Sequence, residues 1–233
     1  MKIAEKLIIL LESNIAIEDC VDGKFVLNPD GSYDVKGDIS LYKEHLLKIP
    51  FSFNKVSGDF MGHENRLTSL VGAPKIVGGY FSCDGNRLTT LEGAPQEVGK
   101  YFNCMENQLV SLAGAPKKIG GYFNCRLNKL TSLEGCPQII GDSIYCGRNK
   151  LTSLVGLPAR VKGDFHCEGN ELVSLKGCPQ IIDGDFHCSD MPSLTSLEGA
   201  PKKVGGNFYC KGFTKKEIRS VCQVSGEIDT NWQ

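Results

Sequence analysis

The chain has 233 residues, of which 41% are hydrophobic and 23% are charged, as is typical of a folded protein rather than a disordered segment. Its 26 Lys and Arg residues nearly balance its 27 Asp and Glu residues, so the formal net charge is -1. A near-neutral chain lacks the attraction that drives non-specific binding to nucleic acids or anionic membranes, and both are disfavoured as partners.

The first predicted element is a short helix at residues 2–12, where Ile3, Leu7 and Leu10 or Leu11 recur at helical spacing. Its apolar run is short, is flanked by glutamates and lacks a small-residue cleavage site, which argues against a secretory signal. No segment approaches the ~20 apolar residues that a membrane span needs. We therefore expect a cytoplasmic protein that does not associate with membranes.

A β-hairpin is predicted next, because KFVL and SYDV flank the turn residues Asn28, Pro29, Asp30 and Gly31. Proline presets its own φ within the turn, and glycine permits the left-handed exit. The helix and the hairpin together would cover the first coil of a stacked array. We assign residues 1–34 to this N-terminal cap.

From Val35 onward the sequence repeats every 21 residues. The repeat is clearest in the cysteines Cys83, Cys104, Cys125, Cys146, Cys167 and Cys188. A strict period of this length is typical of stacked repeats, in which each coil buries its core against its neighbours. We assign residues 35–212 to the repeat array.

Each unit predicts a short strand, a turn and an extended tail. In the unit VGGYFSCDGNRLTTLEGAPQE (77–97), alternation buries Phe81 and Cys83 and directs Tyr80, Ser82 and Asp84 outward. The asparagine of the turn can bond the peptide groups freed there. It recurs as Asn65, Asn86, Asn107, Asn128, Asn149 and Asn170. Since the Gly-Ala-Pro tail is too broken for a helix, the fold class predicted is mostly β, a solenoid with a single parallel sheet on its concave face.

The C-terminal cap is predicted at residues 213–233. Thr214 and Glu217 have the spacing of a capping box, and Ile218, Val221 and Cys222 form the apolar stripe of the helix that follows. A short edge strand is expected after this helix, from residue 226 onward. Cap, array and cap form one continuous domain.

The inward cysteine column has two interpretations. Stacked thiols could form a redox or metal ladder, or cysteine could simply be a small apolar residue that fills a narrow interior. We favour packing, because a thiol beside Phe and Leu stays protonated. The replacement of cysteine by Gly62 in the first regular unit also argues against a metal.

Two outward columns define the predicted binding surface. The first contains Asp38, Asp59, Tyr80, Tyr101, Tyr122, Ser143, Asp164, Asp185 and Asn207, and the second contains Ser40, Met61, Ser82, Asn103, Asn124, Tyr145, His166, His187 and Tyr209. Tyrosine is enriched at interface hot spots. The partner-binding residues predicted from these columns are Tyr80, Tyr101, Tyr122, Asn103, Asn124, Tyr145, His166, His187, Asp164 and Asp185. The alternative is a tyrosine stack that only stabilises the sheet.

A metal site is the less favoured interpretation of His166 and His187, with Asp164 and Asp185 beside them. Imidazole and carboxylate suit zinc, but nothing closes the ligand set and GDFHC simply occurs twice. We predict no metal and no cofactor, and a patch that could make binding to a basic partner sensitive to pH. The irregular unit CSDMPSL (188–194) loses its asparagine and gains a residue, through drift or for binding.

The units resemble the short bacterial type of leucine-rich repeat, in which LTSLEGAP-like tails replace the convex helix. Nearly the whole chain resembles a family of repeat proteins common in tailed-phage and prophage genomes. The resemblance is carried by NPDGSYDVKGDISL, by the VGGYFSC-x-x-N-x-LTSLEGAP array and by KGFTKKEIRSVCQVSGEI. It implies a fold and a viral context but no settled activity. The chain is expected to differ from bacterial effector ligases with similar repeats, since we expect no catalytic domain after residue 213.

The sequence contains no Ser-His-Asp constellation, phosphate loop or paired catalytic carboxylates. We therefore expect a non-catalytic protein–protein interaction module, phage-encoded, that binds a host protein through the concave face. The alternative is a virion component that binds surface glycans or neighbouring subunits. A metal-dependent activity at the two histidines is a third hypothesis. Local nucleic-acid binding stays open at Lys117, Arg126, Lys129 and Arg148.

Overall fold

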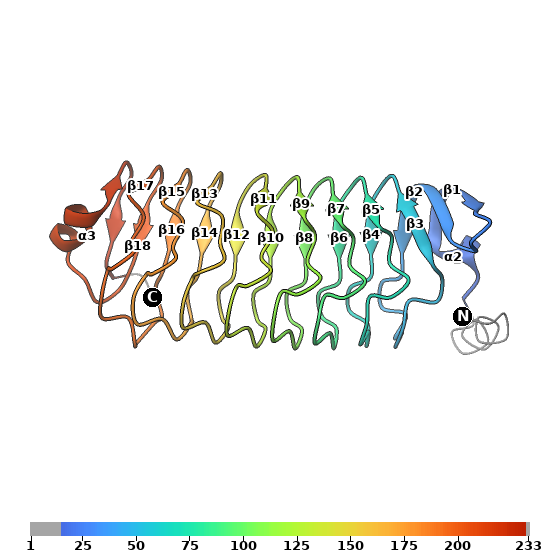
Figure 1. Ribbon diagram of the computed structural model, residues 1–233, viewed down its shortest axis with the longest axis horizontal. Helices are drawn as coiled ribbons and strands as arrows, with labels where there is room; N and C mark the ends of the chain where they lie inside the picture. The colour runs from blue at the N-terminus through green and yellow to red at the C-terminus, as the bar shows by residue number, and fades with distance from the viewer. Residues whose placement is uncertain (1–14, 232–233) are drawn as a thin grey trace.

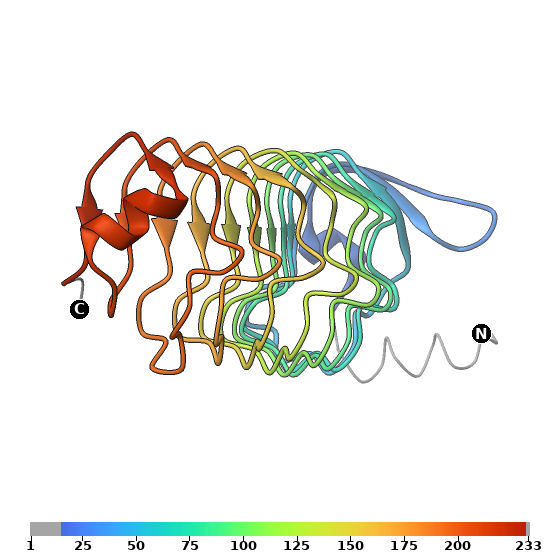
Figure 2. The same cartoon turned by 60° about the vertical axis from the view of Figure 1, so that its left-hand side comes forward.

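The computed structural model describes residues 15–231 and is a parallel β-solenoid. Figure 1 shows the coils stacked side by side along one nearly straight axis, and the same stack is seen more end-on in Figure 2. Each coil of the array contributes a short strand to each of two rows. The predicted class, a mostly β repeat solenoid with a cap at each end of the array, is confirmed.

The N-terminal cap contains a short helix and the predicted hairpin. Helix α2 (Ile17–Cys20) leads into β1 (Val21–Leu27), which pairs antiparallel with β2 (Tyr33–Ser40). The turn closes with the Asn28 amide N–H donating to the Ser32 carbonyl at 2.8 Å. Strand β2 then pairs in parallel with the first strand of each row. The helix predicted at residues 2–12 lies outside the described residues.

Each strand of the first row begins at a buried column residue, which is phenylalanine except for Ile144 and Ile228. The outward surface of this row is called the strand face below. The row contains β4 (Phe60–Met61), β6 (Phe81–Ser82), β8 (Phe102–Asn103), β10 (Phe123–Asn124), β12 (Ile144–Tyr145), β14 (Phe165–His166), β16 (Phe186–His187), β18 (Phe208–Tyr209) and β20 (Ile228–Asp229). Neighbouring strands pair in strict parallel register, for example Phe81 opposite Phe102. Equivalent residues of successive coils are therefore adjacent.

A second strand row ends at the buried valine column and corrects the prediction of a single sheet. It contains β3 (Phe53–Val56), β5 (Ile76–Val77), β7 (Glu97–Val98), β9 (Lys118–Ile119), β11 (Ile139–Ile140), β13 (Arg160–Val161), β15 (Ile181–Ile182), β17 (Lys203–Val204) and β19 (Gln223–Val224). The rows join at β2, and β13–β19 pair separately from the longer sheet. Most strands of this row bury a single side chain, as β5 buries Val77, so no alternation indicates a strand there.

The core is a set of columns that run through the coils. Phe81, Cys83, Leu88 and Leu91 of one unit are all completely buried, as are their counterparts in most of the array. Burial raises the pKa of Cys83 and of the thiols stacked with it, and within residues 15–231 no cysteine forms a disulfide. The cysteine column therefore has the environment expected of a packing role.

The predicted asparagine column forms a buried hydrogen-bond ladder between coils. Asn107 Oδ1 accepts from the Leu88 amide of the preceding coil at 2.9 Å. Its Nδ2 donates to the carbonyl oxygens of Cys83 at 3.0 Å and of Cys104 at 3.2 Å. The ladder is formed by Asn65, Asn86, Asn107, Asn128, Asn149 and Asn170. Each of these asparagines thus ties its own turn to the coil before it.

The C-terminal cap confirms the predicted helix and edge strand. Helix α3 (Lys215–Val221) begins after Thr214, whose hydroxyl accepts from the Glu217 amide while the Glu217 carboxylate accepts from the Thr214 amide. Ile218 is fully buried and anchors the helix. Strands β19 and β20 then extend both rows past the last repeat.

The residue just before each ladder asparagine occupies the left-handed region, and Leu127 does so with a φ of 54°. Glycine holds the equivalent position at Gly85 and Gly169. We predict that Leu127→Gly raises the free energy of unfolding by about 0.5–1 kcal/mol, because relief of left-handed strain exceeds the added chain entropy. Denaturant unfolding measures this. Thr131→Gly, at an exposed position outside the left-handed region, is the control and should not stabilise; equal effects in both variants would contradict the account.

Candidate functional site

Three tyrosines on neighbouring coils of the strand face form a face-to-face stack. The ring centroids of Tyr80 and Tyr101 are 4.5 Å apart at an interplanar angle of 5°, and those of Tyr101 and Tyr122 are 4.6 Å apart at 2°. The first column is therefore brought together as predicted. Both faces of the Tyr101 ring are covered by its neighbours, and only ring edges and the hydroxyl remain for a partner.

The aromatic stack continues by crossing to the second column. Tyr122 meets Tyr145 edge-on at 5.7 Å and 88°, and Tyr145 lies 4.9 Å from His166. His166 then stacks on His187 at 3.9 Å, and His187 stacks on Tyr209 at 4.2 Å. We call this continuous set the aromatic ladder: Tyr80, Tyr101, Tyr122, Tyr145, His166, His187 and Tyr209. Tyr209 was in the second column of the sequence but not among the predicted contact residues.

The predicted acidic residues serve the scaffold. Asp164 Oδ1 accepts from the Asp185 amide at 2.8 Å, and Asp185 Oδ1 accepts from the Asn207 amide at 2.7 Å. Asp59 does the same for the amide of Tyr80 at 2.8 Å. One oxygen of each carboxylate is thus directed along the column at the next coil. These aspartates help to fix coil spacing, whatever they contribute to binding.

A glycine accompanies each of these aspartates. A Cβ at Gly184 would collide with the Asp164 carboxylate, and a Cβ at Gly79 would collide with that of Asp59. The coil that follows an aspartate therefore needs glycine just before the column position. Where the column residue is tyrosine this constraint is lifted. One coil after Tyr80, Lys100 occupies the position that Gly79 holds one coil after Asp59. This pairing of Asp with Gly one coil later is a sequence signal that could have identified the scaffold role.

The two predicted asparagines of the second column make local contacts. Asn103 Oδ1 accepts from the Met105 amide at 3.3 Å, and Asn124 Oδ1 accepts from the Arg126 amide at 3.2 Å. Both side chains are only partly buried. They lie on the strand face next to the tyrosine stack, where they extend the polar surface that the tyrosine hydroxyls provide.

The histidines adjoin a polar hollow that the sequence did not reveal. It has a volume of about 240 Å³ and is lined by Arg126, Arg148, His166, Glu168, His187, Ser189 and Asp190. An ion pair joins Arg126 Nη2 to Glu168 Oε1 at 2.8 Å, two coils apart. Among residues 15–231 no three His, Cys, Asp or Glu side chains are placed to hold a metal ion.

The electrostatics of the hollow keep its groups in defined charge states. Burial and the neighbouring His166 lower the pKa of His187 to about 4, so that His187 is neutral at neutral pH. Burial opposes ionisation of Glu168, but hydrogen bonding and the nearby positive charge outweigh it and the pKa of Glu168 is lowered. In the tyrosine stack, outside the hollow, burial raises the pKa of the Tyr101 hydroxyl, which stays protonated.

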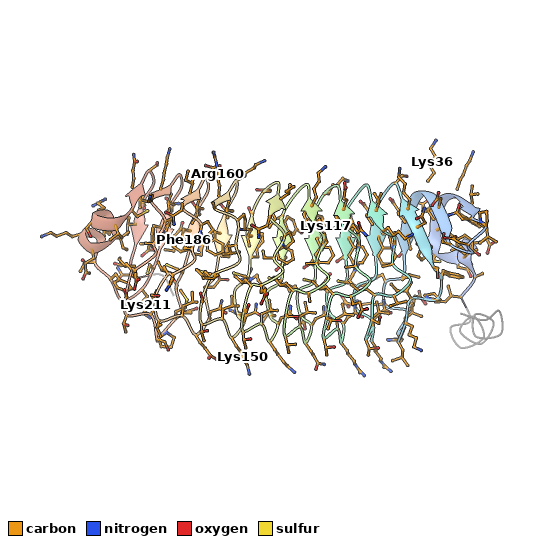
Figure 3. All side chains as sticks on the ribbon, in the orientation of Figure 1. Lys36, Lys117, Lys150, Arg160, Phe186 and Lys211 are labelled. Atoms are coloured by element: carbon orange, nitrogen blue, oxygen red, sulfur yellow. The ribbon has the colours of Figure 1, made fainter. Side chains whose placement is uncertain are left out.

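Two labelled basic side chains lie far apart on the solenoid, and two of the basic set considered for nucleic acid have polar partners. Figure 3 shows Arg160 and Lys150 at opposite long edges of the solenoid. In the basic set considered for nucleic acid, Arg126 is paired with Glu168, and Lys129 donates to Gln108 Oε1 at 3.3 Å. No helix of the described chain is long and apolar enough to cross a bilayer.

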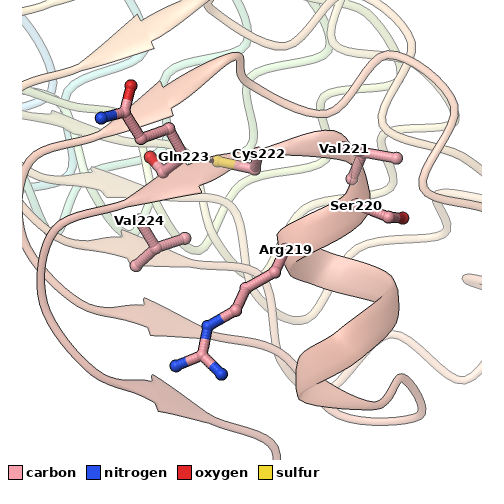
Figure 4. Close-up of a pocket in the computed structure, with 6 residues that line it drawn as sticks. All are labelled: Arg219, Ser220, Val221, Cys222, Gln223 and Val224. Carbon is pink, nitrogen blue, oxygen red and sulfur yellow. Dashed lines mark hydrogen bonds between the residues drawn. The ribbon is translucent and has the colours of Figure 1, made fainter.

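Another hollow lies at the C-terminal end of the solenoid. Figure 4 shows its lining, which consists of the consecutive residues 219–224 at the end of α3 and the start of β19. A lining from one continuous segment brings no distant groups together. We do not consider this hollow a functional site.

Comparison with known proteins gives no relative for this chain: no family model, no curated protein and no solved structure matches it. The leucine-rich-repeat and phage resemblance therefore rests on the sequence motifs alone.

Acid should destabilise the protein through His187. Its pKa is about 4 when folded against an ordinary 6.5, so between these values the unfolded chain binds more protons and stability falls as the pH falls. We predict a loss of about 1 kcal/mol from pH 7 to pH 5, discounted for partial solvent access. His187→Phe keeps a ring in the stack but cannot bind a proton. In this variant the loss of about 1 kcal/mol of folding stability that is due to His187 should be absent.

Thermal unfolding across this pH range measures the effect. His45→Gln is the control, because His45 is exposed and lies outside the aromatic ladder. A pH dependence of the melting temperature that is the same in wild type and His187→Phe would contradict the assignment.

Proposed function

We propose that this protein is a non-catalytic interaction module that binds a protein partner through the strand face, with the tyrosine stack at the centre of the contact. Following the sequence resemblance, we take the solenoid to be of the short leucine-rich-repeat type. We further take it to be phage-encoded and to act in the host cytoplasm on a host protein.

The observation that carries the proposal is the geometry of the aromatic ladder. Its rings are aligned at 4.5 and 4.6 Å in the tyrosine stack and are only partly buried. A ring locked between two others has little rotamer freedom left to lose on binding, which lowers the entropic cost of association. A preorganised row of tyrosine edges and hydroxyls suits the polar, aromatic surface of a protein interface.

The covered ring faces limit how a partner can bind. A partner does not intercalate between the rings, because that would break the stack. Contacts are therefore made to the ring edges and by hydrogen bonds to the hydroxyls, with Asn103 and Asn124 beside them. Recognition of this kind depends on the hydroxyl groups as well as on the rings.

The competing interpretation is that the stack only stabilises the sheet. Stacking of this quality contributes about 0.5–1.5 kcal/mol per pair beyond burial, so some stabilisation follows in either case. The two interpretations differ in what happens to binding when the rings are removed and the fold remains intact.

We expect the double variant Tyr101→Ala/Tyr122→Ala to lose a captured partner, with affinity falling about 30-fold or more, as for hot-spot residues worth ~2 kcal/mol. Tyr101→Phe/Tyr122→Phe keeps the stack and should weaken binding by a smaller factor through loss of the hydroxyls. The measurement is a pull-down of the tagged chain from bacterial host lysate, followed by titration of the captured protein.

The matched control is Tyr42→Ala. Tyr42 is an exposed tyrosine that also stacks on a neighbouring ring, His63 at 4.4 Å, but it lies outside the aromatic ladder. It should lower stability without affecting capture. A folded double alanine variant that retains full affinity would refute the proposal and leave the stack a stabilising device.

A further inference from the structure

The outward surface of the second strand row is strongly basic. In each coil two residues before the buried valine and one residue after it lie outside the core, as Lys75, Ile76 and Gly78 do around Val77. From the coil of β3 to the coil of β17, these three columns contain eight Lys or Arg residues and only two acids. We call this surface, formed by the three columns, the basic face. The formal net charge of -1 for the whole chain conceals it.

Most cations of the basic face have no acidic partner. Its two acids are already paired, since the Arg160 guanidinium donates to Asp183 at 2.9 and 3.0 Å. The second pair is formed by Lys118 Nζ and a carboxylate oxygen of Glu97, 3.9 Å apart. In the described part of the chain the other six cations are exposed and form no ion pair: Lys55, Lys75, Lys117, Lys162, Lys202 and Lys203. Charges of one sign gathered on one face attract an anionic partner.

Isoleucines lie among these cations, each opposite one on a neighbouring strand. The pairs are Lys55 with Ile76, Lys118 with Ile139, and Arg160 with Ile181. Ile139 is 59% exposed and Ile76 is 42% exposed. A neutral residue opposite a cation avoids repulsion between like charges, but a polar residue would serve that purpose equally. An apolar side chain gains free energy only by leaving water, which favours a partner with apolar surface beside its negative charge.

A shallow hollow beside the lysines adds to this apolar surface. It has a volume of about 510 Å³, and Lys75, Gln96 and Lys117 of the basic face line it. The rest of its lining comes mainly from the Gly-Ala-Pro tails, for example Ala94, and Glu92 is its one acid. Apolar lining between two lysines suits an amphiphilic anion better than a bare phosphate chain.

The shape of the basic face separates the possible anionic partners. The coils follow one nearly straight axis (Figure 1), so the cations from Lys55 to Lys203 extend over about 30–35 Å at ~4.8 Å per coil. A planar surface can meet such a row along its whole length. Proteins bind single-stranded nucleic acid by stacking bases on aromatic side chains, and the three columns contain none. Duplex DNA offers phosphates but no apolar layer for the isoleucines.

We propose that the basic face binds the surface of an anionic phospholipid bilayer. The lysines lie among the headgroup phosphates, and the isoleucines enter the boundary between headgroups and acyl chains. The tyrosine stack belongs to the other strand row, so membrane binding and protein binding do not require each other.

The test is co-sedimentation of the full chain with equimolar phosphatidylglycerol–phosphatidylcholine vesicles and with pure phosphatidylcholine vesicles. The wild type should bind the anionic vesicles and be released at about 1 M salt, where the screening length is ~3 Å. Lys117→Gln/Lys202→Gln should weaken binding about 30-fold, or roughly fivefold for each cation removed. Ile139→Ser should weaken it about fivefold, because less apolar surface enters the bilayer. All three residues are exposed, so melting temperatures should stay near that of the wild type.

Lys129→Gln/Lys150→Gln is the matched control, because it removes the same charge from two exposed lysines outside the basic face. Figure 3 shows Lys150 at the long edge opposite Arg160. This control should bind anionic vesicles like the wild type. The proposal is overturned if the wild type does not bind anionic vesicles, if it binds neutral vesicles equally well, or if both lysine pairs change binding to the same extent. Wild-type affinity in Ile139→Ser also overturns it, because the partner would then be recognised by charge alone, as duplex DNA would be.

Discussion

The buried asparagine of each regular turn is the interaction on which the rest of the solenoid depends. One side chain accepts from an amide of the preceding coil and donates to carbonyl oxygens of both coils, as Asn107 does for Leu88, Cys83 and Cys104. Backbone bonds link neighbouring coils beside each turn, as Gln108 donates to the Leu88 carbonyl, but the Leu88 amide and the Cys83 carbonyl are bonded by asparagine side chains. Leaving such buried peptide groups unpaired would be costly. The asparagine removes that cost and fixes each coil in register with the one before it.

Register is what converts separate tyrosines into a surface. Because equivalent residues of neighbouring coils lie directly opposite each other, Tyr80, Tyr101 and Tyr122 stack without further adjustment. The same register lets aspartate carboxylates accept from amides of the next coil. It also requires glycine beside each such amide, because a Cβ there would collide with the carboxylate. Tyr145 keeps this register, opposite Asn124 and His166, so the aromatic contacts change column there through substitution alone. The residue inserted near Met191 lengthens one coil, yet Phe186 and Phe208 still pair in register. The regular coils therefore provide both the scaffold and the tyrosine stack.

The sequence predicts what is local or strictly periodic. Period and alternation identified the repeat, the buried columns, the hairpin and the α3 capping box, because each depends on residues close together or on one repeated spacing. The sequence did not reveal the second row, because a strand such as β5 buries only one residue, Val77, and shows no alternation. It also missed the Arg126–Glu168 pair, because that contact bridges two coils across Gly147 and depends on a missing side chain. For Asp164 and Asp185 a sequence signal of their scaffold role did exist, because each is followed one coil later by a glycine just before the column position.

The central claim, that asparagine bonds hold neighbouring coils in register, is tested most directly by amide hydrogen exchange in Asn107→Ala beside Asn103→Ala. Leu88 donates its amide to Asn107 Oδ1, so loss of that oxygen should speed Leu88 exchange about tenfold or more and lower the free energy of unfolding by about 2–4 kcal/mol. Asn103 lies on the strand face of the same coil, and its removal should leave Leu88 protected. If Leu88 exchanges as slowly in Asn107→Ala as in the wild type, coil register is maintained by other bonds and the account is wrong.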